Sequence, residues 1–250
     1  MLHMDRAGLG LLATITLTLV TGIVDAVGYL GLDRVFTGNM TGNIVILGMG
    51  VAGADDLPVL GPAIALAGFT VGAFAAGLAL HGRPSAGWDT RVTALLGTGA
   101  LILLVLTGAV IVTGDSPSAT GQVVIATAIA AVMGQQAMVA RALAVKDMTT
   151  VVVTSTLTSL AGETWPSRVR GVSANGRLAG VLNRRFAAIL VIFLGALAGA
   201  VLLRLHIAVP LGLAAVLTCA VAIAGHLRLH RDSAEISHAA ESDVGGRAVL

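Results

Sequence analysis

The feature that most constrains this chain is a set of long stretches without charged side chains. Five runs contain no Asp, Glu, Lys or Arg: residues 60–80, 92–113, 119–140, 186–203 and 207–225. A sixth run, residues 7–31, contains a single charge, Asp25. A helix of about 20 apolar residues crosses the hydrocarbon core of a bilayer. The pattern predicts an all-α integral membrane protein with six transmembrane helices.

Composition agrees with a lipid environment. Of the 250 residues, 56% are hydrophobic and 11% are charged, whereas about 25% are charged in a typical soluble domain. We therefore expect the lipid bilayer to be the main partner. No dense basic stripe with interleaved aromatic residues is present, so we expect no nucleic-acid binding. The first apolar stretch is too long for the apolar region of a signal peptide, and we expect an uncleaved first helix.

Two further segments differ from the six runs. Residues 35–53 begin with the polar sequence FTGNMTGN at 36–43 and are interrupted by glycines, and residues 148–162 are short and rich in Thr and Ser. A straight helix rises 1.5 Å per residue, so 15 residues fall short of a hydrocarbon core about 30 Å thick. We expect both to be short re-entrant segments, which enter the membrane and return to the same side.

The order of segments also repeats along the chain. Residues 30–44 resemble 143–157, and residues 72–80 resemble 195–203. We therefore expect a first membrane repeat at 1–115 and a second at 116–226, with a polar cytoplasmic insertion at 163–185 and a disordered cytoplasmic tail at 227–250. Three spans per repeat is an odd number, so the two repeats would be inverted in the membrane, as in many secondary transporters.

The distribution of basic residues selects this topology. With six spans and cytoplasmic N- and C-termini, 13 of the 15 Lys and Arg lie on the cytoplasmic side, and only Arg34 and Arg204 lie outside. If all eight segments crossed, nine of the 15 would be cytoplasmic. Cytoplasmic loops carry an excess of Lys and Arg, which favours six spans and two re-entrant segments.

Asp25 and FTGNMTGN are the candidate site in the first repeat. Asp25 alone among the 13 acidic residues interrupts an apolar span, and a carboxylate at a helix centre costs about 2.5–3.5 kcal/mol on insertion scales. It can serve as a substrate-binding or proton-coupling group, or as a hydrogen-bonded structural carboxyl. The polar octet offers Thr37, Asn39, Thr41 and Asn43, which either bind a solute or only satisfy the backbone of a broken helix.

The second repeat contributes uncharged polar residues to the same candidate site. Gln135 and Gln136 lie near the position that corresponds to Asp25, and Thr150, Thr154 and Thr158 belong to the second re-entrant segment. Each threonine can instead bond to its own helix. The pairs Gly68/Gly72 and Gly195/Gly199 have the spacing of close helix contacts.

No cluster of His or Cys has metal-ligand spacing, and no nucleophile motif or Walker loop is present. We therefore expect no metal or other cofactor and no enzymatic activity.

Two stretches, GIVDAVGYLGLDRVFTGNMTGNIVILG at 22–48 and MGQQAMVARALAVKDMTTVVVTSTLT at 133–158, resemble the YoaK family of multi-pass bacterial membrane proteins. The resemblance covers most of residues 10–226. It implies a bacterial inner membrane protein and no specific function, because the family is a domain of unknown function. In one departure, Gln135-Gln136 stands where the second motif of the family has Gln-Asn.

The sequence favours a secondary transporter of a small polar or anionic solute, with its site where the two re-entrant segments meet and with coupling to protons as one candidate mechanism. The alternatives are a passive channel and a membrane assembly or sensor protein that transports nothing. Neither the solute nor the oligomeric state follows from the sequence.

Overall fold

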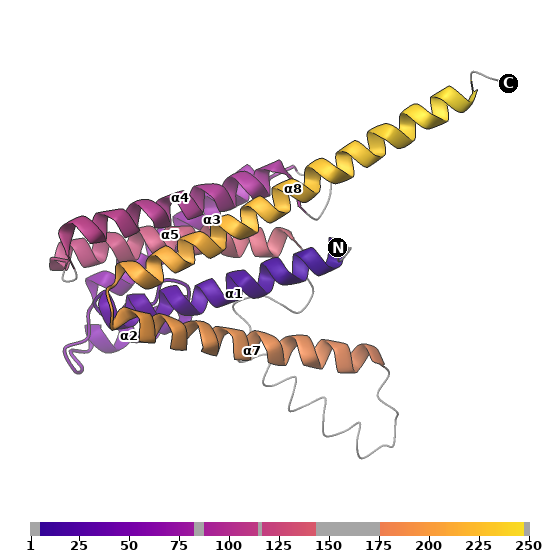
Figure 1. Ribbon diagram of the computed structural model, residues 1–250. Helices are drawn as coiled ribbons and strands as arrows, with labels where there is room; N and C mark the ends of the chain where they lie inside the picture. The colour runs from indigo at the N-terminus through magenta and orange to yellow at the C-terminus, as the bar shows by residue number, and fades with distance from the viewer. Residues whose placement is uncertain (1–5, 83–87, 115–116, 144–175, 248–250) are drawn as a thin grey trace, which may run out of the picture.

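The computed structural model describes residues 6–82, 88–114, 117–143 and 176–247 (Figure 1). Within these ranges all regular secondary structure is helical. The prediction of six long apolar helices is confirmed, and they are α1 (Arg6–Gly31), α3 (Leu60–Ala79), α4 (Thr90–Thr113), α5 (Ala119–Ala142), α7 (Gly176–Leu203) and α8 (Ala208–Arg247). A shorter helix, α2 (Met40–Val51), has 12 residues and is about 18 Å long, too short to cross a membrane.

Polar side chains mark where several helices begin. The carboxylate of Asp89 accepts a hydrogen bond from the N–H of Val92 at 2.9 Å at the start of α4. The hydroxyl of Ser118 accepts one from Gly121 at 3.2 Å at the start of α5. These are ordinary N-caps, which satisfy backbone donors that have no partner inside the helix. At its other end α4 stops at Gly114, whose φ of 90° is accessible to glycine.

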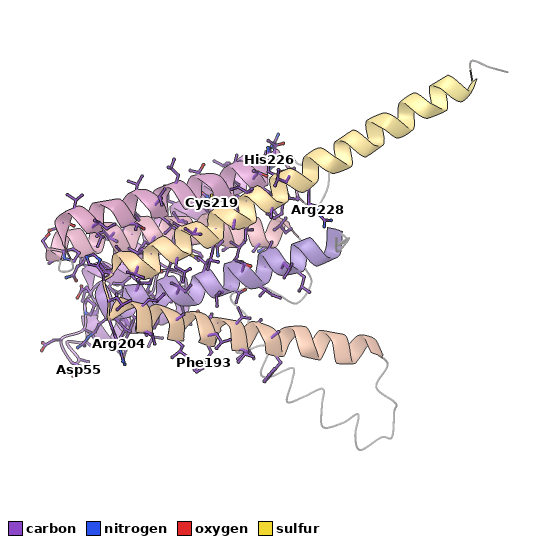
Figure 2. All side chains as sticks on the ribbon, in the orientation of Figure 1. Asp55, Phe193, Arg204, Cys219, His226 and Arg228 are labelled. Carbon is purple, nitrogen blue, oxygen red and sulfur yellow. The ribbon has the colours of Figure 1, made fainter. Side chains whose placement is uncertain are left out.

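The long helices run alternately up and down, so the first residues of α1 and the last of α8 lie at the same end of the bundle (Figure 1). Helix α2 lies at the opposite end. Figure 2 shows Asp55 and Arg204 at the α2 end, and His226 and Arg228 towards the end where the chain begins. The start of α1 and the end of α8 therefore lie on the same side of the bundle. That this side is the cytoplasm remains a prediction from the charge distribution.

The outer surface of the bundle is apolar. Large hydrophobic side chains are exposed on several helices, among them Phe74, Leu101, Val112 and Phe193, and Figure 2 shows Phe193 pointing away from the bundle. A soluble monomer rarely exposes so much contiguous apolar surface. These faces are suited to lipid, in agreement with the expected bilayer partner.

The helices associate in three close pairs. Helix α1 packs along α7, α3 packs along α5, and α4 packs along α8. Smaller contacts join α1 to α8, α4 to α5, and α1 to α5. Each of these contacts maps onto a contact in the same set when α1 is exchanged with α5, α3 with α7, and α4 with α8, whereas the contact of α7 with α8 has no counterpart between α3 and α4 among the principal contacts of the described helices. The exchange is the one that the expected repeat would require.

Glycines allow the first two pairs to approach closely. A Cβ placed on Gly22 of α1 would lie 2.8 Å from the backbone nitrogen of Ala196 on α7, and one placed on Gly134 of α5 would lie 3.0 Å from that of Ala73 on α3. Helix backbones can only touch in this way where a side chain is missing. Ala73 and Ala196 would be equivalent in the expected repeat, since both follow the first glycine of the similar stretches 72–80 and 195–203.

The expected glycine contacts are also present. Gly72 packs against the backbone of Ala131 on α5, and Gly195 packs against the backbone of Leu19 on α1. Gly68 meets Thr127 on α5, and Gly199 meets Ile23 on α1. The two glycine motifs therefore form the cores of the α3/α5 and α1/α7 pairs.

Two helices extend beyond their apolar runs. Helix α8 continues to Arg247, and the disordered tail at 227–250 stays a prediction. The stretch from Leu227 onward contains several good helix formers, and it continues a helix that is already nucleated, so each added residue needs no new nucleus. Helix α7 begins at Gly176, inside the expected polar insertion 163–185. The second expected re-entrant segment, 148–162, lies outside the described residues.

Candidate functional site

Asp25 lies inside α1, six residues before the helix ends at Gly31, and 8% of its surface is exposed. At 1.5 Å per residue, six residues place it about 9 Å from the end of the helix. In the part of the chain that the structure describes, no Lys, Arg or His side chain pairs with its carboxylate. The carboxylate is instead bonded by backbone groups of the polar octet 36–43.

Three consecutive backbone N–H groups converge on one carboxylate oxygen. Oδ1 of Asp25 accepts from Gly38 at 2.6 Å, from Thr37 at 2.9 Å and from Asn39 at 3.4 Å. The hydroxyl of Thr37 lies 3.5 Å from the same oxygen. Because α2 starts at the next residue, Met40, the carboxylate also lies at the partially positive end of this helix. Oδ2 receives no hydrogen bond from any described residue.

The chain returns to Asp25 through a tight reversal after α1. Asp33 and Arg34 both adopt the left-handed conformation, with φ of 57° and 55°, and the N–H of Val35 bonds to the carbonyl of Gly28 at 3.2 Å. A Cβ on Gly28 would lie 3.0 Å from Cγ2 of Thr37. Two uncommon conformations in a row are strained, and they bring the segment 35–39 back along the last turns of α1.

Asn43 fastens the start of this segment to α2. Its side-chain oxygen accepts from the N–H of Phe36 at 2.8 Å, and its Nδ2 donates to the carbonyl of Phe36 at 2.6 Å. Asn43 is 1% exposed, and both of these bonds are partly buried. The ring of Phe36 stacks on Tyr29 of α1 with centroids 4.9 Å apart. The Phe36–Asn43 pair thus holds the returning segment against α1 at a second point.

The remaining predicted residues of the octet have different positions. Asn39 caps α2, because its Oδ1 accepts from Gly42 at 3.2 Å. Asn39 and Thr41 are both exposed, whereas Thr37 and Asn43 are buried. The structure therefore brings Asp25, Thr37 and Asn39 together, and it places Thr41 away from them on the outer face of α2. Most polar groups of FTGNMTGN form hydrogen bonds with other groups of the chain itself.

The two glutamines of α5 face different neighbours. Gln136 is 3% exposed, and its Nε2 donates to the carbonyl of Leu17 at 3.0 Å and towards the hydroxyl of Thr21 at 3.4 Å, both on α1. Gln135 donates to the carbonyl of Leu95 on α4. Thr21 also lies beside Gly38, whose N–H bonds to Asp25. Gln136 is therefore grouped with Asp25, whereas Gln135 belongs to a separate contact.

Thr150, Thr154 and Thr158 lie outside the described residues. The expected meeting of the two re-entrant segments is therefore not tested, and neither is any contact between these threonines and Asp25. Their assignment to the candidate site stays a prediction.

Three buried threonines were missed by the sequence analysis. Thr14, Thr18 and Thr21 of α1 are each 4% exposed or less. Their spacing of four and three residues, continued by another four to Asp25, extends over about three turns and places all four residues on one side of the helix. This spacing is readable from the sequence, but threonines are common throughout the apolar runs and the pattern was not distinguished from them.

Comparison with known proteins agrees with the resemblance seen in the sequence. Residues 13–224 match the family described as "Protein of unknown function (DUF1275)". The chain is 36% identical over 144 residues to the UPF0700 transmembrane protein YoaK of Bacillus subtilis (strain 168). This match covers 58% of the present chain and 62% of the relative. No solved structure is significantly similar to the chain.

The family match spans most of the chain and includes Asp25, the octet 36–43 and Gln136. The six apolar helices agree with a relative that is itself described as a transmembrane protein. The chain belongs to the DUF1275 family of multi-pass membrane proteins, whose function is not known.

Proposed function

We propose that this protein is a secondary transporter of a small polar solute, with Asp25 as the group that couples transport to proton binding. One observation carries the proposal. The carboxylate of Asp25 is buried inside a candidate membrane-spanning helix, and it accepts hydrogen bonds from the backbone of the segment that links α1 to α2. Ionisable residues within spans are expensive and are usually associated with ion or substrate pathways. The proposal places the termini in the cytoplasm of a bacterial cell.

Protonation of Asp25 would change the hold on this segment. Hydrogen bonds to an ionised acceptor are roughly twice as strong as bonds between neutral groups. Ionised Asp25 therefore holds residues 37–39 firmly against α1, and a neutral carboxyl holds them less firmly. Since this segment and α2 connect α1 to α3, a proton that arrives at Asp25 alters the link between two of the close helix pairs. That is the kind of coupling that a proton-driven carrier requires.

The arrangement of helices supports the same proposal. The three helix pairs map onto themselves when the expected repeats are exchanged, and the glycine contacts of α1 with α7 have counterparts in those of α5 with α3. Inverted repeats with a broken segment near the site are typical of secondary transporters, in which one bundle rocks against another. We infer that residues 35–53 form a re-entrant segment of this type.

The test uses purified protein in liposomes that contain a pH-sensitive dye. A thermal-shift screen against small metabolites first selects solutes that stabilise the protein, and each is then added outside while the internal pH is recorded. We expect a solute-dependent pH change that is lost in Asp25→Asn. Asp55→Asn is the matched control, because Asp55 is an exposed acid with φ of 55°, a conformation that Asn tolerates.

Wild-type protein that folds and binds a solute but moves neither the solute nor protons would contradict the transporter proposal. Solute flux that proceeds without any proton movement, and that Asp25→Asn leaves intact, would remove Asp25 from the mechanism. Loss of flux in both Asp25→Asn and Asp55→Asn would also remove its special role.

A further inference from the structure

We propose that the solute passes along the buried face of α1 that carries Thr14, Thr18, Thr21 and Asp25, beside Gln136 of α5, and that it is a cation or a hydrogen-bond donor such as a protonated amine. This deepens the transporter proposal and rests on it. The five residues are called the acceptor seam below, because the hydrogen-bonding capacity left free on them consists of acceptors.

The four α1 residues of the acceptor seam form a continuous line along one helix. At 100° per residue the four positions on α1 fall within about 60° of the helix circumference, and from Thr14 to Asp25 they extend about 16 Å. All four side chains are buried. Buried polar residues on one narrow face of an otherwise apolar span are typical of a pathway rather than of a lipid-facing surface. The line leads from Asp25 towards the end of the bundle where the chain begins.

The donors along this line are already used. The hydroxyl of Thr14 donates to the carbonyl of Gly10 at 2.9 Å, that of Thr18 to Thr14 at 2.8 Å, and that of Thr21 to Leu17 at 2.9 Å. The N–H groups at 37–39 are committed to Oδ1 of Asp25. Because each hydroxyl has one hydrogen and two lone pairs, every threonine retains acceptor capacity and no donor. A hydroxyl could serve an anion only if it gave up its backbone carbonyl.

Gln136 adds an independent indication that points to a ligand. Its Nε2 is directed at Leu17 and Thr21 on α1, which fixes the orientation of the amide because a carbonyl oxygen can only accept. Its Oε1 is buried, and no donor among the described residues reaches it. A buried acceptor without a partner costs about 1–3 kcal/mol. A solute that brings a donor to this oxygen recovers that free energy.

Charge agrees with this selection. Asp25 is the only charged residue in the interior of the six described spans, and the others, Arg91, Arg141 and Arg228, lie within two residues of a span end. The interior that the described spans enclose is therefore either neutral or negative, according to whether Asp25 is protonated. A cation is attracted in the ionised state, whereas an anion would meet a carboxylate and a row of acceptors.

The seam also lies between two of the close helix pairs. Helix α1 belongs to the α1/α7 pair and α5 belongs to the α3/α5 pair, and α1 and α5 contact each other less extensively than either contacts its glycine-packed partner. A relative movement of these two pairs would expose the seam without breaking either close contact. The buried threonines would then become accessible to water-soluble molecules.

Accessibility to charged thiol reagents tests the proposal without knowledge of the natural solute. Thr14→Cys and Thr18→Cys are made separately in a Cys219→Ala background, and the protein is placed in nanodiscs so that both sides are reachable. The probes are the cationic 2-(trimethylammonio)ethyl and the anionic 2-sulfonatoethyl methanethiosulfonates. Thr70→Cys and Thr98→Cys are the matched controls, since these threonines bond to their own helices in the same way but are exposed on outer faces.

We expect the cationic reagent to modify the two seam cysteines at least tenfold faster than the controls. We also expect it to react at least tenfold faster than the anionic reagent, after correction for their rates with free cysteine. Addition of Asp25→Asn should reduce this preference several-fold. Only variants that elute as monodisperse folded protein are compared, and two seam positions guard against a single variant that fails to fold.

Two results would overturn the proposal. If neither seam cysteine reacts faster than the controls, the path does not run along α1. If the anionic reagent is preferred, the inferred class of solute is wrong. Neither result affects the proton-flux test, in which Asp25→Asn is compared with Asp55→Asn, so failure of the seam and failure of the transporter proposal can be told apart.

Discussion

Replacement of Asp25 by Asn should separate local from global stability. Asn keeps the size of the side chain and one acceptor oxygen but removes the charge. A hydrogen bond to a charged group contributes about 1.5–3 kcal/mol, against about 0.5–1.5 kcal/mol for a neutral one, so each bond loses about 1 kcal/mol. Two short bonds, from Gly38 at 2.6 Å and Thr37 at 2.9 Å, would together lose about 2 kcal/mol.

A local loss of about 2 kcal/mol corresponds to roughly 30-fold faster opening, because 1.4 kcal/mol is a factor of ten. Global stability should not fall by the same amount, since removal of a buried charge relieves a cost of about 2.5–3.5 kcal/mol on insertion scales. Hydrogen exchange measured by mass spectrometry in nanodiscs should therefore show faster exchange in peptides that cover 36–43, with an unchanged or higher melting temperature.

The matched control is again Asp55→Asn, which should leave exchange at 36–43 unchanged. Equal exchange rates at 36–43 in wild type and Asp25→Asn would refute the reasoning, because the carboxylate would then not be holding the segment. A uniform increase over all helices would refute it as well, since that would indicate a global role for Asp25.

Three further predictions test the packing of the helices, the hydrogen bonds between Phe36 and Asn43, and the topology. Gly134→Leu should sharply reduce the yield of folded protein, because its side chain would meet the α3 backbone. Gly97→Leu should not, because nothing lies within 4 Å of a Cβ there. The two yields are compared by size-exclusion chromatography. Asn43→Ala removes both bonds to Phe36 and should cost about 1–3 kcal/mol, seen as a lower melting temperature than that of wild type. A cysteine at Asp56 should be labelled by an impermeant reagent only from outside the cell, and labelling only from the cytoplasm would reverse the topology.

The spans could be predicted from the sequence because exclusion of charge from lipid is a strong and local constraint. The structure begins α4 at Thr90 and ends α5 at Ala142, each two residues from the ends of the uncharged runs. Asp25 was found for the same reason, since a lone carboxylate in such a run stands out. The far end of α8 was not found, because helical continuation beyond the membrane depends on propensity and leaves no apolar pattern.

The contacts of Asp25 could not be predicted in this way. They depend on the reversal at Asp33 and Arg34. Asp adopts left-handed backbone more readily than most residues, but Arg has no such preference. The octet stands out in the sequence as polar groups in an apolar setting, but the sequence does not show that the N–H groups of residues 37–39 bond to the carboxylate of Asp25. The seam of threonines escaped notice because a hydroxyl bonded to its own helix is common in membrane spans.

The most direct test of the central claim is counterflow with a solute identified by thermal shift. Liposomes with wild-type protein are loaded with unlabelled solute, diluted, and given a trace of labelled solute outside. We expect transient, saturable accumulation of label in wild type. We also expect Asp25→Asn to retain this exchange but to lose accumulation driven by a pH gradient. Non-saturable flux without counterflow would indicate a channel, and proton-driven accumulation that survives in Asp25→Asn would contradict the role assigned to Asp25.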